Sequence, residues 1–209
     1  DTHRRGLGAL VQRFGGDYQR FIPADLPDEG MLEPHTTILD NFNRANADAL
    51  GTSSEGWSWT ETFGDIDIVS NKARGQAAPC DARAESDLSS ANHYSQAGCT
   101  NAATTILMGL LARFASAERT YYWGAHSDSG TATYRMYKAI NGTLTQLVNV
   151  DTTSPGAGEI IDKMSSDGST QEFTSGGTVR LTVTDTAITG NLRCGIRGST
   201  FLGNHDFDN

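Results

Sequence analysis

Asn141-Gly142 is the sequence feature that most constrains the fold, because it lies between two segments with the pattern of β-strands. Asn and Gly readily adopt the two positive φ angles of a type I′ turn, which matches the twist of paired antiparallel strands. The same reasoning predicts a looser turn over residues 127–130. The stretch from Thr104 to Val150 is therefore predicted to form four consecutive antiparallel strands at the centre of an all-β protein.

The composition extends this prediction to most of the chain. With 23 Gly and 5 Pro among 209 residues, and abundant Thr and Ser, it favours strands and turns over helices. More than ten short strands separated by turns are expected after residue 35, which is typical of a two-sheet antiparallel sandwich. The net charge of −9 argues against nucleic acid as a partner, and no apolar run is long enough to span a membrane.

Residues 1–35 differ from the rest and are predicted to form a docking arm and linker, leaving residues 36–209 as the sandwich. Pro23, Pro27 and Pro34 lie in an acidic linker, and glycines interrupt a basic segment before it. This segment cannot bury itself well alone, so we expect it to pack on another subunit; the alternative is a strap across its own domain. Its apolar residues recur at helical spacing: Leu7, Leu10, Val11, Phe14, Tyr18 and Phe21.

The three cysteines leave two interpretations open. Cys80 and Cys99 flank a polar segment symmetrically, and they would lie opposite each other, close enough for a disulfide, if that segment were a hairpin. The alternative is two buried thiols. Cys194 is expected to pack as a small apolar residue, and no cysteine or histidine spacing suggests zinc.

Several short motifs resemble concanavalin A-like (laminin G-like) jelly-roll domains, which are common in tailed-phage virion proteins and in secreted bacterial proteins. They include Leu39-Asp-Asn-Phe-Asn-Arg-Ala-Asn46, Ile68-Val-Ser-Asn-Lys-Ala73, Thr120-Tyr-Tyr-Trp123 and Asp206-Phe207. The resemblance covers residues 37–209 and implies an antiparallel jelly-roll sandwich of two sheets. One departure is that a hairpin expected between Val183 and Asp185 is reduced to Thr184.

The resemblance also suggests a calcium ion, because jelly rolls of this kind often hold one with carboxylates and carbonyls from loops. Asp40, Asp206 and Asp208 would approach one another if the first and last strands pair, as the resemblance implies. The alternative is that these are edge-strand acids that discourage aggregation. No other cofactor is expected.

A catalytic reading of Asp65-Ile-Asp-Ile-Val-Ser-Asn71 rests on its superficial likeness to the Glu-x-Asp-x-x-Glu strand of glucanases with this fold. Asp65 and Asp67 would share one face of a strand. Retaining hydrolysis needs a second carboxyl group about 5–5.5 Å from the first as acid/base, and Ser70 occupies that position. We therefore expect no catalysis and assign no catalytic residue.

Glycan binding is the remaining candidate, since sugars stack on exposed aromatic rings and bond to polar groups beside them. Alternation separates Tyr122 from Tyr121 and Trp123, and places Arg135 and Tyr137 together. A patch of Tyr122, Arg135 and Tyr137 is predicted, against the alternative that these side chains only pack and cover the surface.

Taken together, the sequence predicts a non-enzymatic structural or adhesion component of a phage virion, either a capsid decoration or a tail protein. The arm would bind other virion proteins, several copies would assemble, and the sandwich would face outward toward host-surface glycans. The alternatives are a secreted, lectin-like carbohydrate-binding module and, with less support, a glucanase-like hydrolase.

Overall fold

The computed structural model describes residues 38–101, 107–128, 131–153, 158–199 and 205–208. The predicted docking arm, from Leu7 to Phe21, lies outside these residues. Within the described ranges, no helix is long and apolar enough to cross a bilayer.

The described residues form twelve strands joined by turns and loops, and contain no helix. Neighbouring strands in the described residues pair antiparallel, as the sequence predicted. The strands are β1 (Trp59–Val69), β2 (Lys72–Ala84), β3 (His93–Asn101), β4 (Met108–Phe114), β5 (Tyr121–Asp128), β6 (Thr131–Ile140), β7 (Thr143–Thr153), β8 (Glu159–Asp167), β9 (Thr170–Ser175), β10 (Thr178–Thr184), β11 (Arg193–Gly198) and β12 (His205–Asp208).

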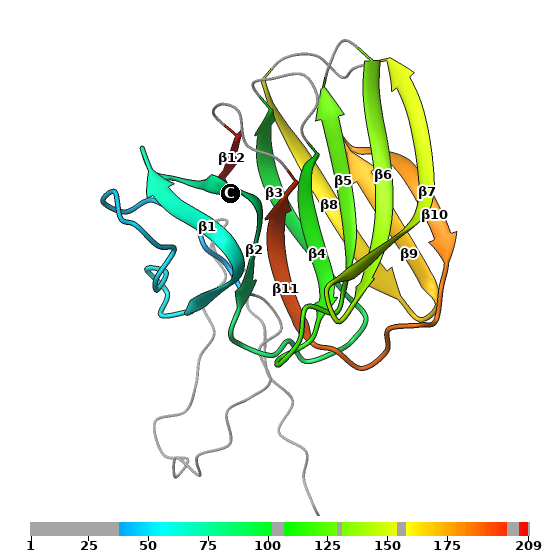
Figure 1. The fold of residues 1–209 in the computed structure, drawn as a ribbon, viewed down its shortest axis with the longest axis horizontal. Coiled ribbons are helices and arrows are strands. Elements are labelled where there is room, and N and C mark those ends of the chain that lie inside the picture. The colour runs from blue at the N-terminus through cyan, green and yellow to red at the C-terminus, as the bar shows by residue number, and fades with distance from the viewer. Residues whose placement is uncertain (1–37, 102–106, 129–130, 154–157, 200–204, 209) are drawn as a thin grey trace, which may run out of the picture. The chain divides into compact units, whose positions relative to one another are not determined.

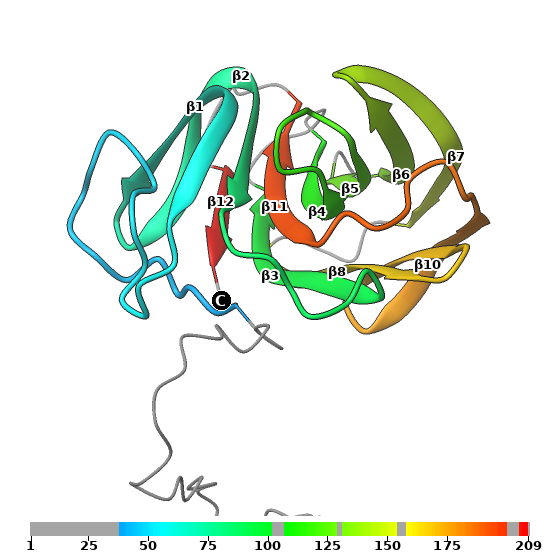
Figure 2. The ribbon, with the colours of Figure 1, turned by 90° about the horizontal axis from the view of Figure 1, so that it is seen from below.

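The strands pair in the order β10-β9-β8-β3-β12-β2-β11-β4-β5-β6-β7, with β1 added to β2 (Figure 1). β2 belongs to both layers of the sandwich because it is long: Ala73 and Arg74 pair with β12, whereas residues 80–83 pair with β11. Figure 2 shows the two layers, with β3, β8 and β10 in one and β11, β4, β5, β6 and β7 in the other. The ladder thus folds over at β12 and β2, and the apolar faces meet inside.

The main core lies between the two layers and draws large side chains from both. Met164 of β8 and Phe173 of β9 are fully buried and belong to one cluster with Leu110, Tyr122 and Met136 of the opposite layer. β4 and β5 are unusual because their other face is buried too: every side chain from Met108 to Phe114 and from Tyr121 to Ser127 is buried. A second apolar cluster therefore covers the outer face of this layer.

The four consecutive strands predicted around Asn141-Gly142 are confirmed as β4 to β7. Asn141 has φ of 50° and Gly142 has φ of 80°, the two positive angles of the predicted turn. Further along, strict alternation in residues 178–184 predicts that Val179, Leu181 and Val183 all point inward, but Val179 is 51 % exposed, so this part of the prediction is wrong. The ladder between β9 and β10 shifts register between Val179 and Leu181, which turns Val179 outward.

The three cysteines are free, so the bridge between Cys80 and Cys99 is not formed. The segment between them is not a simple hairpin, because β12 lies between β2 and β3 and pairs with both. Cys80 and Cys99 are buried, and burial raises the pKa of Cys80 to about 12 and that of Cys194 to about 11. Burial also raises the pKa of Cys99 well above its ordinary value.

We therefore expect the native protein to react slowly with Ellman's reagent at pH 8, because the thiolate is the reactive form and all three thiols resist ionisation. In guanidinium chloride without reductant, three thiols per chain should react. One thiol per chain after unfolding would instead reveal a disulfide, and rapid labelling of the native protein would contradict the observed burial.

Candidate functional site

The candidate site is the outer face of the layer formed by β11, β4, β5 and β6. Trp123 pairs with Leu111 on β4 and with Tyr137 on β6, so the three side chains lie on one face. In the next row Ala125 pairs with Gly109 and Arg135. Trp123, Leu111 and Ala125 all belong to the second apolar cluster, and Tyr137 packs against it, which identifies this face as the outer one.

Trp123 is the middle member of a stack on this face. Its ring lies 4.9 Å from the Tyr137 ring at an interplanar angle of 22°, and the Arg197 guanidinium lies 4.8 Å from its centroid. Trp123 is 1 % exposed, whereas Tyr137 is half-buried. The stack therefore holds the Tyr137 ring in a fixed orientation at the edge of a buried cluster.

Asp81 of β2 fixes the basic end of this stack. Its Oδ2 accepts hydrogen bonds from Arg119 Nη2 at 2.9 Å, Arg197 Nη1 at 2.8 Å and Tyr121 Oη at 2.8 Å. The Asp81 side chain is fully buried and that of Arg197 is 4 % exposed. Burial raises the pKa of Tyr121, so the phenol stays protonated and donates.

The accessible rim of the face lies on β6 and β7. Arg135 is half-buried, and its Nη1 donates to Tyr137 Oη at 3.4 Å. Gln146 pairs with Tyr137 and Asn149 pairs with Arg135 across the ladder, and both amides are exposed. A half-exposed ring, a guanidinium and two amides thus lie side by side, which is the combination of stacking surface and hydrogen-bonding groups that sugars require.

Arg135 and Tyr137 share one partly accessible face, as alternation predicted, but Tyr122 does not lie on that face. Tyr122 pairs with Lys138, points into the core between the layers and is fully buried. Its Oη donates to Asp185 Oδ1 at 2.6 Å, and burial, followed by this bond, raises the pKa of Tyr122 to about 12. The alternation that separated Tyr122 from Trp123 was right, but the side that faces solvent was misassigned.

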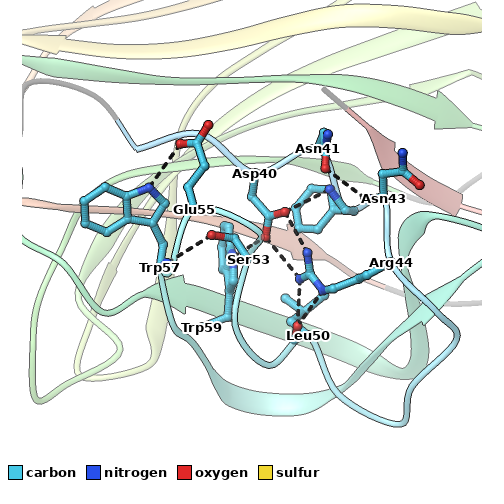
Figure 3. A network of polar contacts seen from close by, with 10 residues as sticks. Asp40, Asn41, Asn43, Arg44, Leu50, Ser53, Glu55, Trp57 and Trp59 are labelled. Atoms are coloured by element: carbon cyan, nitrogen blue, oxygen red, sulfur yellow. Dashed lines mark hydrogen bonds and ion pairs between the residues drawn. The ribbon is translucent and has the colours of Figure 1, made fainter.

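The three aspartates of the predicted calcium site are each engaged with a basic side chain. Asp40 is bound by Arg44 Nη1 at 2.7 Å and by Trp59 Nε1 at 2.7 Å (Figure 3). Asp206 pairs with Arg74 at 2.6 Å and Asp208 with Lys72 at 3.0 Å. No three Asp, Glu, His or Cys side chains gather in the described part of the chain, so this geometry lends no support to calcium.

The glucanase-like motif begins on β1, which pairs with β2. Ser70 and Asn71 have φ of 53° and 64° and form the turn into β2, so the position expected for the acid/base falls outside the strand. The pKa of Glu61 is raised, chiefly by burial and further by the charges of Asp65 and Asp67. Burial and the Asp65 charge also raise the pKa of Asp67.

A cavity of about 290 Å³ lies elsewhere, between β3 and β11, and Phe42, Trp59 and Leu110 are among the residues that line it. His93 is its one imidazole, and both ring nitrogens have partners, the Ser90 carbonyl at 2.9 Å and the Arg113 N–H at 3.0 Å. Burial lowers the pKa of His93, which keeps the ring neutral. Both ring nitrogens of His93 are therefore used in hydrogen bonds that hold the structure.

Comparison with known proteins identifies the fold class. The solved carbohydrate-binding module CBM66 from Bacillus subtilis superposes with a TM-score of 0.60 at 13 % identity, covering 72 % of this chain and 92 % of the module. The Bacillus licheniformis β-glucanase gives 0.53 at 10 % identity, covering 81 % and 94 %. A glycoside hydrolase family 16 endo-glucanase from Bacteroides ovatus gives 0.51 at 7 % identity, covering 81 % and 96 %.

The chain therefore has the concanavalin A-like jelly-roll fold that its motifs suggested. No family model matches the sequence, and no curated protein matches it. The structural neighbours include both a binding module and enzymes, so the fold by itself does not decide the activity.

The sequence interpretation missed Trp123, Arg197 and Asp81, which organise the site. Alternation separated Trp123 from Tyr122 and left it out of the predicted patch, whereas it is buried on the outer face beside Tyr137. Arg197 and Asp81 are 116 residues apart, and no local pattern connects them. One available signal was Gly109, where a Cβ would clash with the Gly124 carbonyl oxygen of β5.

Proposed function

We propose that this chain is a non-catalytic carbohydrate-binding protein whose binding surface is the accessible rim of the outer face on β6 and β7, with Tyr137 as the stacking ring. The observation that carries the proposal is the ring of Tyr137, half-buried and held 4.9 Å from the buried Trp123. A ring fixed in this way loses little conformational freedom when a ligand stacks on it. The fold shared with a carbohydrate-binding module and with glucanases is consistent with this role.

An outward-facing adhesion protein of a phage virion is the finer form of this proposal. It rests on the sequence resemblance and on the predicted docking arm of residues 1–35, which would bind other virion proteins and gather several copies. Binding of host-surface glycans by the sandwich would then serve attachment. Deleting residues 1–35 tests this form, because the truncated protein should keep its glycan affinity and no longer join its assembly.

Tyr137→Ala is expected to weaken glycan binding about tenfold or more, because a stacking aromatic at the centre of a site typically contributes over ~1.4 kcal/mol. Affinity can be measured by calorimetry with a polysaccharide retained in a pull-down screen. Tyr137→Phe keeps the stack and should stay within about threefold of the native affinity.

Tyr94→Ala is the matched control. Tyr94 is 57 % exposed on β3 of the other layer, and Lys163 lies 4.7 Å from its ring, so it is also a tyrosine beside a cation. Removing it should leave glycan affinity unchanged. Equal losses in both variants, or no loss in Tyr137→Ala while the protein remains folded, would contradict the assignment of the outer face.

One observation favours a second candidate, a hydrolase: Glu61 and Asp67, two carboxyl groups with raised pKa, lie near Asp65 on β1. This candidate predicts that the protein releases reducing ends from β-glucans and that Asp65→Asn and Asp67→Asn abolish the release. The binding proposal predicts no release from either the native protein or the variants.

A further inference from the structure

We infer that the glycan bound on the outer face carries a carboxylate, as uronic acid sugars do, and that Arg135 is the residue that receives it. This inference rests on the proposed function and specifies its ligand. It starts from hydrogen-bond donors on this face that have no acceptor in the described part of the chain. They are Arg135 Nε, Arg197 Nε and Trp123 Nε1.

An unmet buried donor is costly, typically about 1–3 kcal/mol, so native proteins leave few of them. Here three unmet donors occur on one face, on Trp123 at 1 % exposure, on Arg197 at 3 % and on the half-buried Arg135, beside one unmet acceptor, Oδ1 of the buried Asp81. Trp123 and Arg197 lie beneath the surface, so Arg135 is the donor residue of this set that a ligand can contact. An acceptor oxygen on that ligand would remove the cost at Arg135.

The two arginines flank a strip of small side chains. Arg197 pairs with Gly109 on β4, and Arg135 pairs with Ala125 on β5, so both belong to the same row across four strands. Three strand spacings separate them, roughly 14 Å in all. Gly109 and Ala125 are both buried, and the stacked rings of Trp123 and Tyr137 connect the two arginines, so the end of the row that a ligand can reach is Arg135.

The local charge differs in sign from that of the chain. Arg119 and Arg197 share the single carboxylate of Asp81, while the bond that Arg135 makes is to the Tyr137 hydroxyl. Arg83, in the row of Trp123 and Tyr137, pairs with Glu85 at 2.6 Å, and Asp151, opposite Thr133 on β7, is exposed. Four guanidinium groups, those of Arg83, Arg119, Arg135 and Arg197, thus accompany the three carboxylates of Asp81, Glu85 and Asp151, in a chain of net charge −9.

Geometry favours a carboxylate over a hydroxyl as the missing acceptor. The Nε and Nη2 edge of a guanidinium binds both oxygens of a carboxylate, and Arg74 does this with Asp206 in this same structure, at 2.6 and 2.9 Å. Arg135 uses Nη1 for Tyr137, so its Nε remains for a ligand. Nε is shielded in the free protein while the Arg135 side chain is half-buried, so the inference includes a change of the Arg135 rotamer on binding that presents Nε beside the Tyr137 ring.

The test uses the full chain and two polysaccharides that differ in charge alone, sodium polygalacturonate and its methyl ester, with alginate, hyaluronate, neutral β-glucan and dextran sulfate as further probes. We expect at least one carboxylated polysaccharide to bind about tenfold more tightly than the neutral ones. Arg135→Gln should lose about tenfold for that ligand. Raising the salt concentration should weaken binding less in Arg135→Gln than in the native protein.

Lys163→Gln is the matched control, because Lys163 also lies beside a tyrosine but on the other layer. This variant should bind the carboxylated polysaccharide with the same affinity as the native protein. Arg197→Lys is a second variant; because it loosens the bond to Asp81, its unfolding midpoint is measured alongside its affinity. Equal affinity for the acid and its ester, with Tyr137→Ala still destroying binding, would overturn this inference and leave the proposed function intact. A preference for dextran sulfate over every carboxylated probe would overturn it too, and retention of none of the polysaccharides would overturn both.

Discussion

Asp81→Asn is expected to lower the free energy of unfolding by about 3–5 kcal/mol, the range for breaking a buried ion pair by removing one partner. Asp81 is fully buried and receives bonds from Arg119, Arg197 and Tyr121 on a single carboxylate oxygen. Without its negative charge, the Arg197 guanidinium would remain buried at 3 % exposure with no counter-ion. Denaturation by urea, followed by tryptophan fluorescence, measures the loss.

Asp87→Asn serves as the control for this prediction. Asp87 pairs with Arg193 at 2.7 Å, but its side chain is 57 % exposed, and exposed pairs contribute about 0–1 kcal/mol. If Asp81→Asn proves no more destabilising than Asp87→Asn, the carboxylate does not anchor the outer face. The stack of Arg197 on Trp123 would then need another explanation.

The second large effect is expected at the bond between the two layers, where His126 of β5 meets Asp162 of β8. The distance from Nδ1 to Oδ2 is 2.5 Å, and neither side chain is exposed. When the carboxylate is ionised it can only accept, so Nδ1 carries the proton. Asp162→Leu and His126→Leu are each expected to lower the free energy of unfolding by about 3 kcal/mol, because each leaves a buried polar partner unmet.

The double variant distinguishes a true coupling from two separate packing defects. Replacing both partners removes the unmet group, so the combined loss should fall short of the sum by at least about 1 kcal/mol. Lys163→Gln, at the next position of β8, should cost less than about 0.5 kcal/mol. Strict additivity in the denaturation curves would show that the two side chains do not depend on each other.

Much of the fold could be predicted because its signals are local. Asn141-Gly142 specifies positive φ at two successive positions, and the alternation of the flanking segments follows from the two-residue period of a strand. The all-β class and the order of the central strands followed from these patterns. Val179 was placed on the wrong face because a register shift of one residue leaves no mark in composition.

Of the candidate site, the sequence joined Arg135 with Tyr137 but did not include Trp123, and this omission has a physical cause. Alternation correctly put Tyr122 and Trp123 on opposite faces of β5, but every described side chain of this strand is buried, so hydrophobicity does not distinguish the two faces. Arg135 and Tyr137 could be joined to each other within one strand. The partner of Tyr137 across the ladder is Trp123 rather than Tyr122, and that depends on the register between β5 and β6.

The sequence by itself thus determined the strands, their turns and which residues share a face within each strand, because these properties depend on neighbours one or two positions away. Only the tertiary structure decided which face is the core and which residues meet across strands. Asp81 and Arg197 are 116 positions apart, yet they are buried together beside Trp123 and Tyr121. Such contacts arise when β11 inserts between β2 and β4, and no local property of the chain specifies that pairing.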